Sequence, residues 1–232
     1  MKKLLCCVVI FTCVTMAGAQ AKKPAAKATG PVPTGPTANI DTTAGQMSCK
    51  LFEKQAPIGV ANFIGLAEGT KEWTSPTSGK SMKGTPLYNG TIFHRVIPNF
   101  MIQGGDPAGT GSGQSGIAFG LEIAPGLNFD RAGRLAYANT SLPNSNGSQF
   151  FITEQATPDL NGNYTIFGQC TPATVLLVKK IARMPRDPRN DRPFNPVKIN
   201  KITIVRGAKG AAKAPTKKPA ATAKKKPAAA TK

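Results

Sequence analysis

Residues 93–106 read Phe-His-Arg-Val-Ile-Pro-Asn-Phe-Met-Ile-Gln-Gly-Gly-Asp, and this stretch decides how the remaining chain is interpreted. Its side chains can alternate between two faces as far as Pro98, which predicts a short strand that ends there because proline cannot donate to a sheet ladder. A second short strand is predicted to follow. The two strand ends would present four side chains to one apolar groove that carries a cation: Arg95, Phe100, Met101 and Gln103. The alternative is a buried Arg95 paired with a carboxylate such as Asp106.

The first 19 residues have the pattern of a secretory signal peptide. Lys2 and Lys3 give a positive start, residues 4–16 form an apolar run of 13 residues, and Ala17-Gly18-Ala19 is a small-residue cleavage pattern. The run is too short to span a bilayer, so cleavage after Ala19 is predicted and a retained, uncleaved anchor is the alternative. The sequence therefore predicts an exported protein that resides in the periplasm, with secretion from the cell as the alternative.

The positive charge lies mainly at the two ends of the chain. Residues 39–205 hold 16 basic and 11 acidic residues, a net charge of +5, so the ends carry the remaining +14 of the formal +19. Residues 20–38 and 207–232 are rich in Ala, Lys and Pro with almost no large apolar residues, and both are predicted to be disordered. Between them, residues 39–206 are long enough for one domain with one core.

The basic tail, residues 207–232, contains eight lysines and no acidic residue. Such a tail suits binding to an anionic polymer, phospholipid headgroups or nucleic acid, without sequence preference and with steep salt dependence. A solvated spacer is the alternative.

Two cysteines remain after removal of the predicted signal peptide, namely Cys49 and Cys170. An exported compartment permits a disulfide between them. Their spacing does not reveal whether the geometry allows one, and two buried thiols that pack as small apolar groups are the alternative.

Residues 39–206 contain many short strand patterns and two helical patterns. One helix is predicted to begin at Pro57 and to end before Gly69, and a second follows Thr171-Pro172. A closing strand is predicted over residues 197–205, with a bulge where its apolar phase slips. Two dipeptides are strong turn signals: Asn146-Gly147 and Asn161-Gly162. These features favour a β-barrel or a β-sandwich with two helices.

Few residues are suited to chemistry that breaks bonds. His94 is the single histidine, and it is interpreted as a structural hydrogen-bonding group rather than as a metal ligand. The chain has no Gly-x-Ser-x-Gly elbow, so a Ser-His-Asp hydrolase is not supported. Glu122 and Asp130 are interpreted as surface groups instead of an acid–base pair. No metal and no cofactor is therefore predicted, which leaves an apolar set with one guanidinium and several neutral amides.

A second stretch, residues 144–152, reads Asn-Ser-Asn-Gly-Ser-Gln-Phe-Phe-Ile. Together with residues 93–106 it resembles the cyclophilin family of peptidyl-prolyl cis–trans isomerases, and the likeness extends over about residues 39–205. The resemblance implies a mainly β fold, a closed eight-stranded antiparallel β-barrel capped by two α-helices. It also implies an enzyme that rotates X–Pro peptide bonds of polypeptide substrates and is expected to be a monomer.

The motif positions transfer the family's site to this sequence. Arg95 would be the catalytic arginine, with Gln103 and Asn139 beside it in the catalytic set. These two amides and Gln149 would hold the substrate backbone. The resemblance also implies a proline pocket made of Phe100, Met101, Phe151 and Leu160.

Two positions at the rim of this pocket depart from the best-known eukaryotic members of the family. Tyr164 takes the place of a histidine and would preserve an aromatic wall with a polar tip. Asp159 stands where a tryptophan is often found, so an indole donor is lost. Only weak binding of cyclosporin-type ligands is therefore expected.

The reaction suits these residues because it breaks no covalent bond. Rotation about a peptide bond has a barrier of about 18–20 kcal/mol, and the two X–Pro ground states differ by only about 1 kcal/mol. A guanidinium can donate to the proline nitrogen, which regains its lone pair only in the twisted transition state. The predicted role is to assist folding of exported proteins. The alternative is a proline-segment-binding chaperone module with weak catalysis, which the basic tail would tether to an anionic polymer, a membrane or nucleic acid.

Overall fold

The computed structural model describes residues 33–206, so the predicted signal peptide, the basic tail and most of the predicted linker lie outside the described residues. Eight strands form one sheet in the order β12-β1-β2-β9-β7-β8-β6-β5, and all paired neighbours are antiparallel. The strands are β1 (Thr37–Thr42), β2 (Gly45–Leu51), β5 (Arg95–Ile97), β6 (Met101–Gly104), β7 (Arg134–Tyr137), β8 (Phe150–Thr153), β9 (Ile166–Cys170) and β12 (Ile199–Val205).

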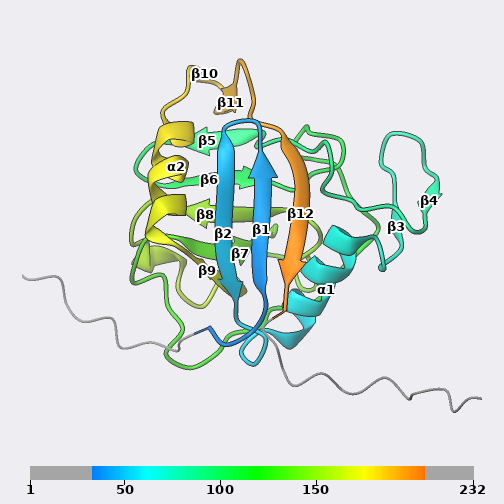
Figure 1. Cartoon of the computed structure of the whole chain (residues 1–232), viewed down its shortest axis with the longest axis horizontal. Helices are drawn as coiled ribbons and strands as arrows, with labels where there is room; N and C mark the ends of the chain where they lie inside the picture. Colours follow the sequence, from blue (N-terminus) through cyan, green and yellow to red (C-terminus); the bar gives the residue numbers. More distant parts are fainter. Residues whose placement is uncertain (1–32, 207–232) are drawn as a thin grey trace, which may run out of the picture.

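Two helices and two small strand pairs complete the described fold. Figure 1 shows α2 beside β2 and α1 beside β12, in agreement with the contacts between these elements. Among residues 33–206, no helix is both long and apolar enough to cross a bilayer. The additional elements are α1 (Pro57–Glu68), α2 (Pro172–Ala182), the 3-10 turn Pro158–Leu160, the pair β3 (Trp73–Thr74) and β4 (Ser81–Met82), and the pair β10 (Arg186–Asp187) and β11 (Arg192–Pro193).

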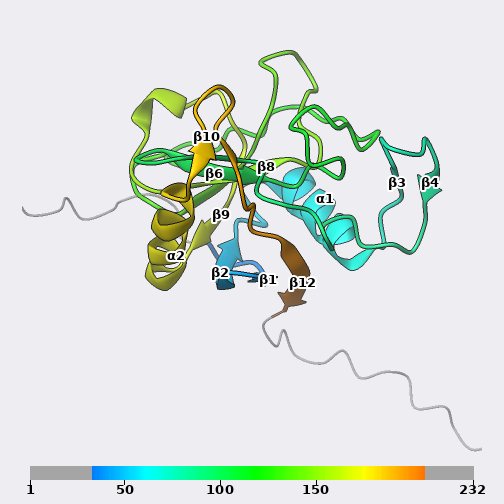
Figure 2. The ribbon, with the colours of Figure 1, turned by 90° about the horizontal axis from the view of Figure 1, so that it is seen from above.

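The eight-stranded sheet curls over itself. In Figure 1 the strands β1, β2 and β12 run across β5, β6 and β8, and Figure 2 shows the same arrangement from above. The edge strands β5 and β12 do not form a ladder with each other, but their leading segments meet at one bridge between Ile92 and Lys198. Phe93 also donates its backbone N–H to the Val197 carbonyl at 2.9 Å. The eight antiparallel strands and two helices are thus confirmed as a curled sheet, and full closure into a barrel stays a prediction.

The domain begins earlier than predicted. β1 includes Thr37 and Ala38, which the sequence assigned to the linker, and Ala38 is buried opposite Cys49 and Ile204. The first strand therefore starts two residues before the predicted boundary at residue 39, because a small residue such as alanine does not mark a strand by its apolarity. The bulge predicted in the last strand is confirmed, since Asp41 and Thr42 pair with Lys201 and Ile199 and leave one residue unpaired.

Strand alternation divides the apolar side chains between two cores. The larger core lies inside the curled sheet and includes Val96, Ile102, Phe150 and Ile152. A smaller outer core lies on the opposite face of β6, β7 and β8. Its buried members are Phe52, Met101, Leu127, Phe129, Ala136, Phe151 and Ile166.

Helix α1 has the predicted ends, with Pro57 as its first residue and Gly69 in a left-handed conformation after its last turn. Its amino end is satisfied by Glu122, whose carboxylate accepts from the N–H groups of Ile58 and Gly59 at 2.9 and 2.7 Å. The interpretation of Glu122 as a surface group is thus corrected, because this half-buried side chain connects a loop to the helix.

One of the two predicted turns is wrong. Asn161-Gly162 does form a turn, with Gly162 at a positive φ of 78°. Asn146 instead is buried and pairs with Phe119 as an isolated β-bridge, so Asn146-Gly147 lies in an extended segment. The turn lies two residues earlier, where Asn144 takes a positive φ of 54°.

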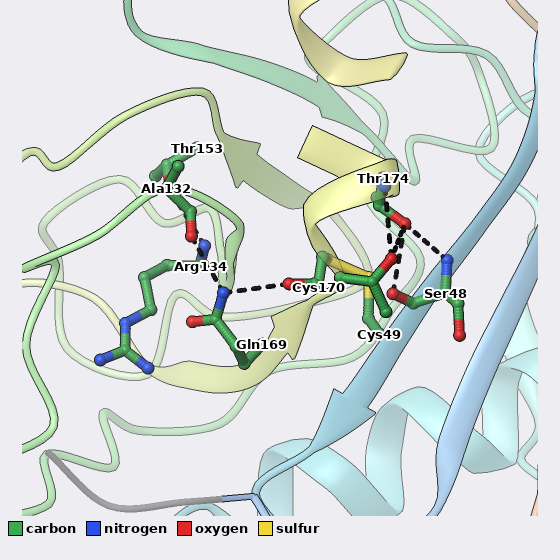
Figure 3. Close-up of a disulfide and its surroundings, with 9 residues drawn as sticks. Ser48, Cys49, Ala132, Arg134, Thr153, Gln169, Cys170 and Thr174 are labelled. Carbon is green, nitrogen blue, oxygen red and sulfur yellow. Dashed lines mark hydrogen bonds between the residues drawn. A yellow bond between two sulfur atoms is a disulfide. The ribbon is translucent and has the colours of Figure 1, made fainter. Parts of the chain in front are cut away.

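Cys49 and Cys170 form a disulfide, which settles the alternative that the sequence left open. The two residues lie directly opposite each other on β2 and β9. Figure 3 shows Gln169 beside them, and its amide donates to the Ala132 and Cys170 carbonyls at 2.9 and 3.1 Å. Thr174 at the start of α2 donates to the Ser48 carbonyl at 3.2 Å. The disulfide therefore reinforces the place where β2, β9 and α2 meet.

Removal of this disulfide should destabilise the fold. It links residues separated by 121 positions, and a cross-link over such a loop restricts the unfolded chain strongly. We expect the double variant Cys49→Ala/Cys170→Ala to lose about 2–5 kcal/mol of unfolding free energy in denaturant titrations. A reductant should weaken the wild-type protein and leave the variant unchanged. Equal wild-type stability with and without reductant would contradict the expectation.

Candidate active site

One row of side chains crosses four neighbouring strands of the sheet. Arg95 on β5 is paired with Gln103 on β6, Gln103 with Phe151 on β8, and Phe151 with Ala136 on β7. Residues that are directly paired across strands point to the same face. Short-range alternation in two stretches that are far apart in the sequence thus places a cation, an amide and an aromatic ring next to one another.

A small cavity of about 120 Å³ opens on this face, and we call it the proline pocket after the role that the family resemblance implies for it. It brings together eight of the nine predicted site residues, and Gln149 is the exception. Ala138 is an additional wall residue that the sequence did not indicate. The lining is Arg95, Phe100, Met101, Gln103, Ala138, Asn139, Phe151, Leu160 and Tyr164.

The floor of the proline pocket is aromatic and closely packed. Phe151 is buried and meets Tyr164 edge to face, with ring centroids 5.4 Å apart. Phe129, which the sequence did not indicate, stacks behind Phe151 at 5.9 Å. Phe150 lies in the inner core instead, as strand alternation predicts. Asp159 is exposed and does not line the pocket, so that rim position supplies no wall.

The guanidinium of Arg95 faces the groove and is partly exposed, at 42 % of the side chain. Its ion-pair partner is Asp191, with 3.8 Å between Nε and the carboxylate, and not the predicted alternative Asp106. Asp191 also accepts from Arg186 at 3.1 Å. Such a long and partly exposed pair orients a side chain without binding it tightly. Within residues 33–206 no hydrogen bond uses the guanidinium N–H groups of Arg95, so they can donate to a substrate.

Asp106 has a different role from the one considered in the sequence. Its buried carboxylate accepts from four backbone N–H groups of the following loop, at 2.6–3.1 Å. Burial alone would raise the pKa of Asp106, but the hydrogen bonds from the loop amides outweigh it and hold the pKa below its ordinary value. The donors are Ala108, Thr110, Gly111 and Gly113.

Gln103 and Gln149 form a hydrogen-bonded pair. Gln103 donates to the Gln149 side-chain oxygen at 3.0 Å, and Gln149 donates to the Gly111 and Gly113 carbonyls at 3.1 and 3.3 Å. Gln149 therefore lies outside the proline pocket, in an adjoining cavity of about 570 Å³. Its interactions position Gln103, whose side-chain oxygen accepts no hydrogen bond within the described part of the chain.

The side chain of Asn139 is occupied by its own loop. It donates to the Asn163 carbonyl at 2.9 Å and accepts from the Ser141 N–H at 3.0 Å. The backbone N–H and C=O of Asn139 make no hydrogen bond to any residue between 33 and 206. The polar groups that Asn139 offers to the groove are therefore those of its backbone.

His94 does not behave as the hydrogen-bonding group that the sequence suggested. Its ring is only 4 % exposed, and neither nitrogen makes a well-formed hydrogen bond among the described residues, although the Ile92 backbone lies close enough to raise the pKa of the imidazole. Burial lowers the pKa of His94, the nearby Asp106 carboxylate raises it, and Arg192 and Arg95 lower it further. The net direction is downward, so the imidazole is neutral at pH 7.

The groove thus combines a small apolar pocket, an oriented cation, a positioned amide and an unpaired backbone segment. This combination suits a protein that holds a compact apolar group in the pocket and hydrogen-bonds the extended chain on either side of it.

Comparison with known proteins identifies the family. A family model described as cyclophilin type peptidyl-prolyl cis-trans isomerase matches residues 37–204, and the chain belongs to this family. A probable peptidyl-prolyl cis-trans isomerase A of Mycobacterium leprae is 50 % identical over 135 residues, which is 58 % of this chain and 73 % of that protein. Peptidyl-prolyl cis-trans isomerase B of Streptomyces anulatus is 46 % identical over 132 residues, 57 % of this chain and 74 % of that protein.

Solved structures agree. A cyclophilin type peptidyl-prolyl cis-trans isomerase of Cryptosporidium parvum has a TM-score of 0.62 at 36 % identity, covering 75 % of this chain and 99 % of its own. A structure of the same protein in the presence of the dipeptide Ala-Pro gives 0.60 at 37 % identity, covering 74 % and 99 %. The chain is therefore a cyclophilin-type peptidyl-prolyl cis–trans isomerase.

Replacement of Asp106 tests its role in the loop. The variant Asp106→Asn keeps the shape of the side chain, but it replaces one acceptor oxygen by an NH₂ group that faces the N–H donors of the loop. We therefore expect the unfolding free energy at pH 7 to fall by about 2–4 kcal/mol. The folded pKa of Asp106 is depressed, so its stabilisation is complete above about pH 4 and is lost as the pH falls through the folded pKa. Denaturant titrations from pH 7 to pH 3 should therefore show the two proteins converging. A difference that stays constant with pH would count against this role.

Proposed function

We propose that Arg95 catalyses rotation about X–Pro bonds by donating to the proline nitrogen in the twisted transition state. The planar ground state offers little lone-pair density there, so the hydrogen bond favours the transition state selectively. The observation that carries the proposal is the position of Arg95 at the mouth of the proline pocket, with guanidinium N–H groups that are not used within the described chain. The structure of the Cryptosporidium protein in the presence of the dipeptide Ala-Pro supports a substrate that contains an X–Pro bond.

Positioning of the substrate completes the mechanism. The proline ring would rest on Phe151, between Met101 and Leu160, which holds one side of the rotating bond. The unpaired backbone of Asn139 can pair with the residue before proline as one strand pairs with another. Gln103, held by Gln149, can hydrogen-bond the substrate backbone beside Arg95. Fixing one side of the bond while the other rotates is a matter of orientation, which is why no covalent intermediate is required.

Loss of the guanidinium should remove most of the catalysis. We expect Arg95→Ala to lower kcat/KM on an Ala-Pro peptide by about 10²–10³-fold, the usual cost of one donor directed at the transition state. Arg95→Lys should recover little, since a lysine presents no planar fork of donors. NMR exchange spectroscopy or a protease-coupled assay measures both rates.

Arg186→Ala is the matched control, because Arg186 pairs with the same Asp191 and does not line the proline pocket. It should change kcat/KM by less than about threefold. Equal rates for wild type and Arg95→Ala would contradict the mechanism. Retained assistance to a refolding client by Arg95→Ala would favour the alternative function, a proline-segment-binding chaperone with weak catalysis.

We further propose that the enzyme acts on exported proteins as a periplasmic monomer, with secretion or an uncleaved anchor as the other routes. The signal-like residues 1–19 support this, and so does the disulfide, because disulfides persist in oxidising compartments. Amino-terminal sequencing of protein recovered from the cell envelope tests it, and a chain that begins at Gln20 is expected. The exposed Asp159 leads us to expect weak binding of cyclosporin-type ligands.

The basic tail suggests a tether to anionic polymers, phospholipid or nucleic acid. Its eight lysines in residues 207–232 carry no compensating acid, so any such binding should weaken steeply with salt. Elution from an anionic resin tests this with the full chain and with a chain that ends at Arg206. Elution of both at the same salt concentration would refute the tether.

A further inference from the structure

A second cavity adjoins the proline pocket, and we call it the cationic pocket. Its volume is about 300 Å³, and it shares Arg95 and Gln103 with the proline pocket. Residues from β5, β6, the loop after Asp106 and the β10–β11 hairpin form its walls. The lining is His94, Arg95, Gln103, Thr110, Gly111, Asn190 and Arg192.

The lining of the cationic pocket is positively charged and contains no carboxylate. Arg192 donates through one guanidinium nitrogen to the Gly109 carbonyl, and its remaining N–H groups have no partner within residues 33–206. Of the nearby acids, Asp106 is committed to the loop amides and Asp191 to Arg186 and Arg95. Two guanidinium groups therefore border one cavity with donors to spare, an arrangement that favours a carboxylate.

The wall of the cationic pocket also contains the unpartnered ring of His94. The side chain is more than nine-tenths buried, and neither nitrogen makes a well-formed hydrogen bond within the described chain, the nearby Ile92 backbone being the one polar neighbour that raises its pKa by hydrogen bonding. Gly111 lies against this ring with a positive φ of 88°, and a Cβ there would be 3.3–3.4 Å from the ring atoms Cδ2 and Nε2. His94 is the one side chain of residues 33–206 with two buried polar atoms that lack such a hydrogen bond, and a buried polar group without a partner needs an explanation. A negative charge in the cavity would favour the protonated imidazole and so compensate for its burial.

We propose that the cationic pocket binds the carboxylate side chain of an Asp or Glu residue close to the X–Pro bond, so that the enzyme selects acidic segments of its substrates. The inference rests on the proposed isomerase mechanism. Because the two pockets share Arg95 and Gln103, a chain whose proline occupies one can reach the other within one to three residues, at 3.8 Å between successive Cα atoms. Arg192 is then a specificity-determining residue, and the hairpin β10–β11 is the element that supplies it.

The test compares peptides that differ by one charge. Each peptide contains one X–Pro bond and carries either Glu or Gln at a single position, up to three residues from the proline. The peptide ends are acetylated and amidated, so that no terminal carboxylate competes for the cationic pocket. We expect wild type to prefer Glu at one or two positions by about three- to tenfold in kcat/KM. Arg192→Gln should bring that ratio to about one. Arg189→Gln, on the same hairpin but paired with Asp187 and outside the cavity, should keep the preference.

A second measurement needs no variant. His94 is the single histidine of the chain, so its imidazole signals are unambiguous in NMR spectra. Binding of the preferred Glu peptide should raise the pKa of His94, and the matched Gln peptide should not. Equal turnover of Glu and Gln peptides at every position, or an unchanged His94 pKa with the Glu peptide bound, would overturn the proposal. If the wild-type protein isomerised neither the Glu nor the Gln peptide, this result would instead refute the isomerase mechanism on which the proposal rests.

Discussion

The groove depends on the charge of one buried carboxylate. Asp106 is the last residue of the stretch 93–106, which contains β5 and β6. Its carboxylate accepts hydrogen bonds from four N–H groups of the following loop, which would otherwise lack partners. That loop supplies the carbonyls of Gly111 and Gly113, which hold Gln149, and Gln149 in turn holds Gln103. A charge that does not line the proline pocket therefore positions an amide that does. The gathered loop also forms part of both cavities that flank the proline pocket.

The curled sheet acts as a platform with two faces. One face packs the inner core, and the other carries Arg95, Gln103 and Phe151 in a single row. A slip of one residue in the register of β6 or β8 would turn this row into the core and the core into the groove. The inner side chains thus maintain the register on which the site depends.

Much of this arrangement could be predicted from the sequence, because strand alternation is local and the two motifs are long. The strands β5, β6 and β8, with Arg95, Gln103 and Phe151 on one face, follow from those two features. The family resemblance adds Asn139, Leu160 and Tyr164 to the same pocket. The ends of α1 follow from Pro57 and Gly69. The partner of Arg95 could not be predicted, since Asp191 lies on a hairpin 96 positions away and reaches β5 only through tertiary pairing. The Asn146 turn failed for a similar reason: a bridge to Phe119 overrides the turn preference of Asn-Gly. The contact of Phe129 with Phe151 is likewise visible only in three dimensions.

The packing of the outer core links the binding of a ligand in the proline pocket to the stability of the enzyme. Phe129 stacks on Phe151 within this core, and Phe151 in turn lines the proline pocket, where the packing of the core ends at an open cavity. Under the proposed mechanism, a bound proline ring would complete this packing. A ligand that binds only the folded form shifts the folding equilibrium toward it. A substrate in the proline pocket would therefore stabilise the folded enzyme for as long as it stays bound.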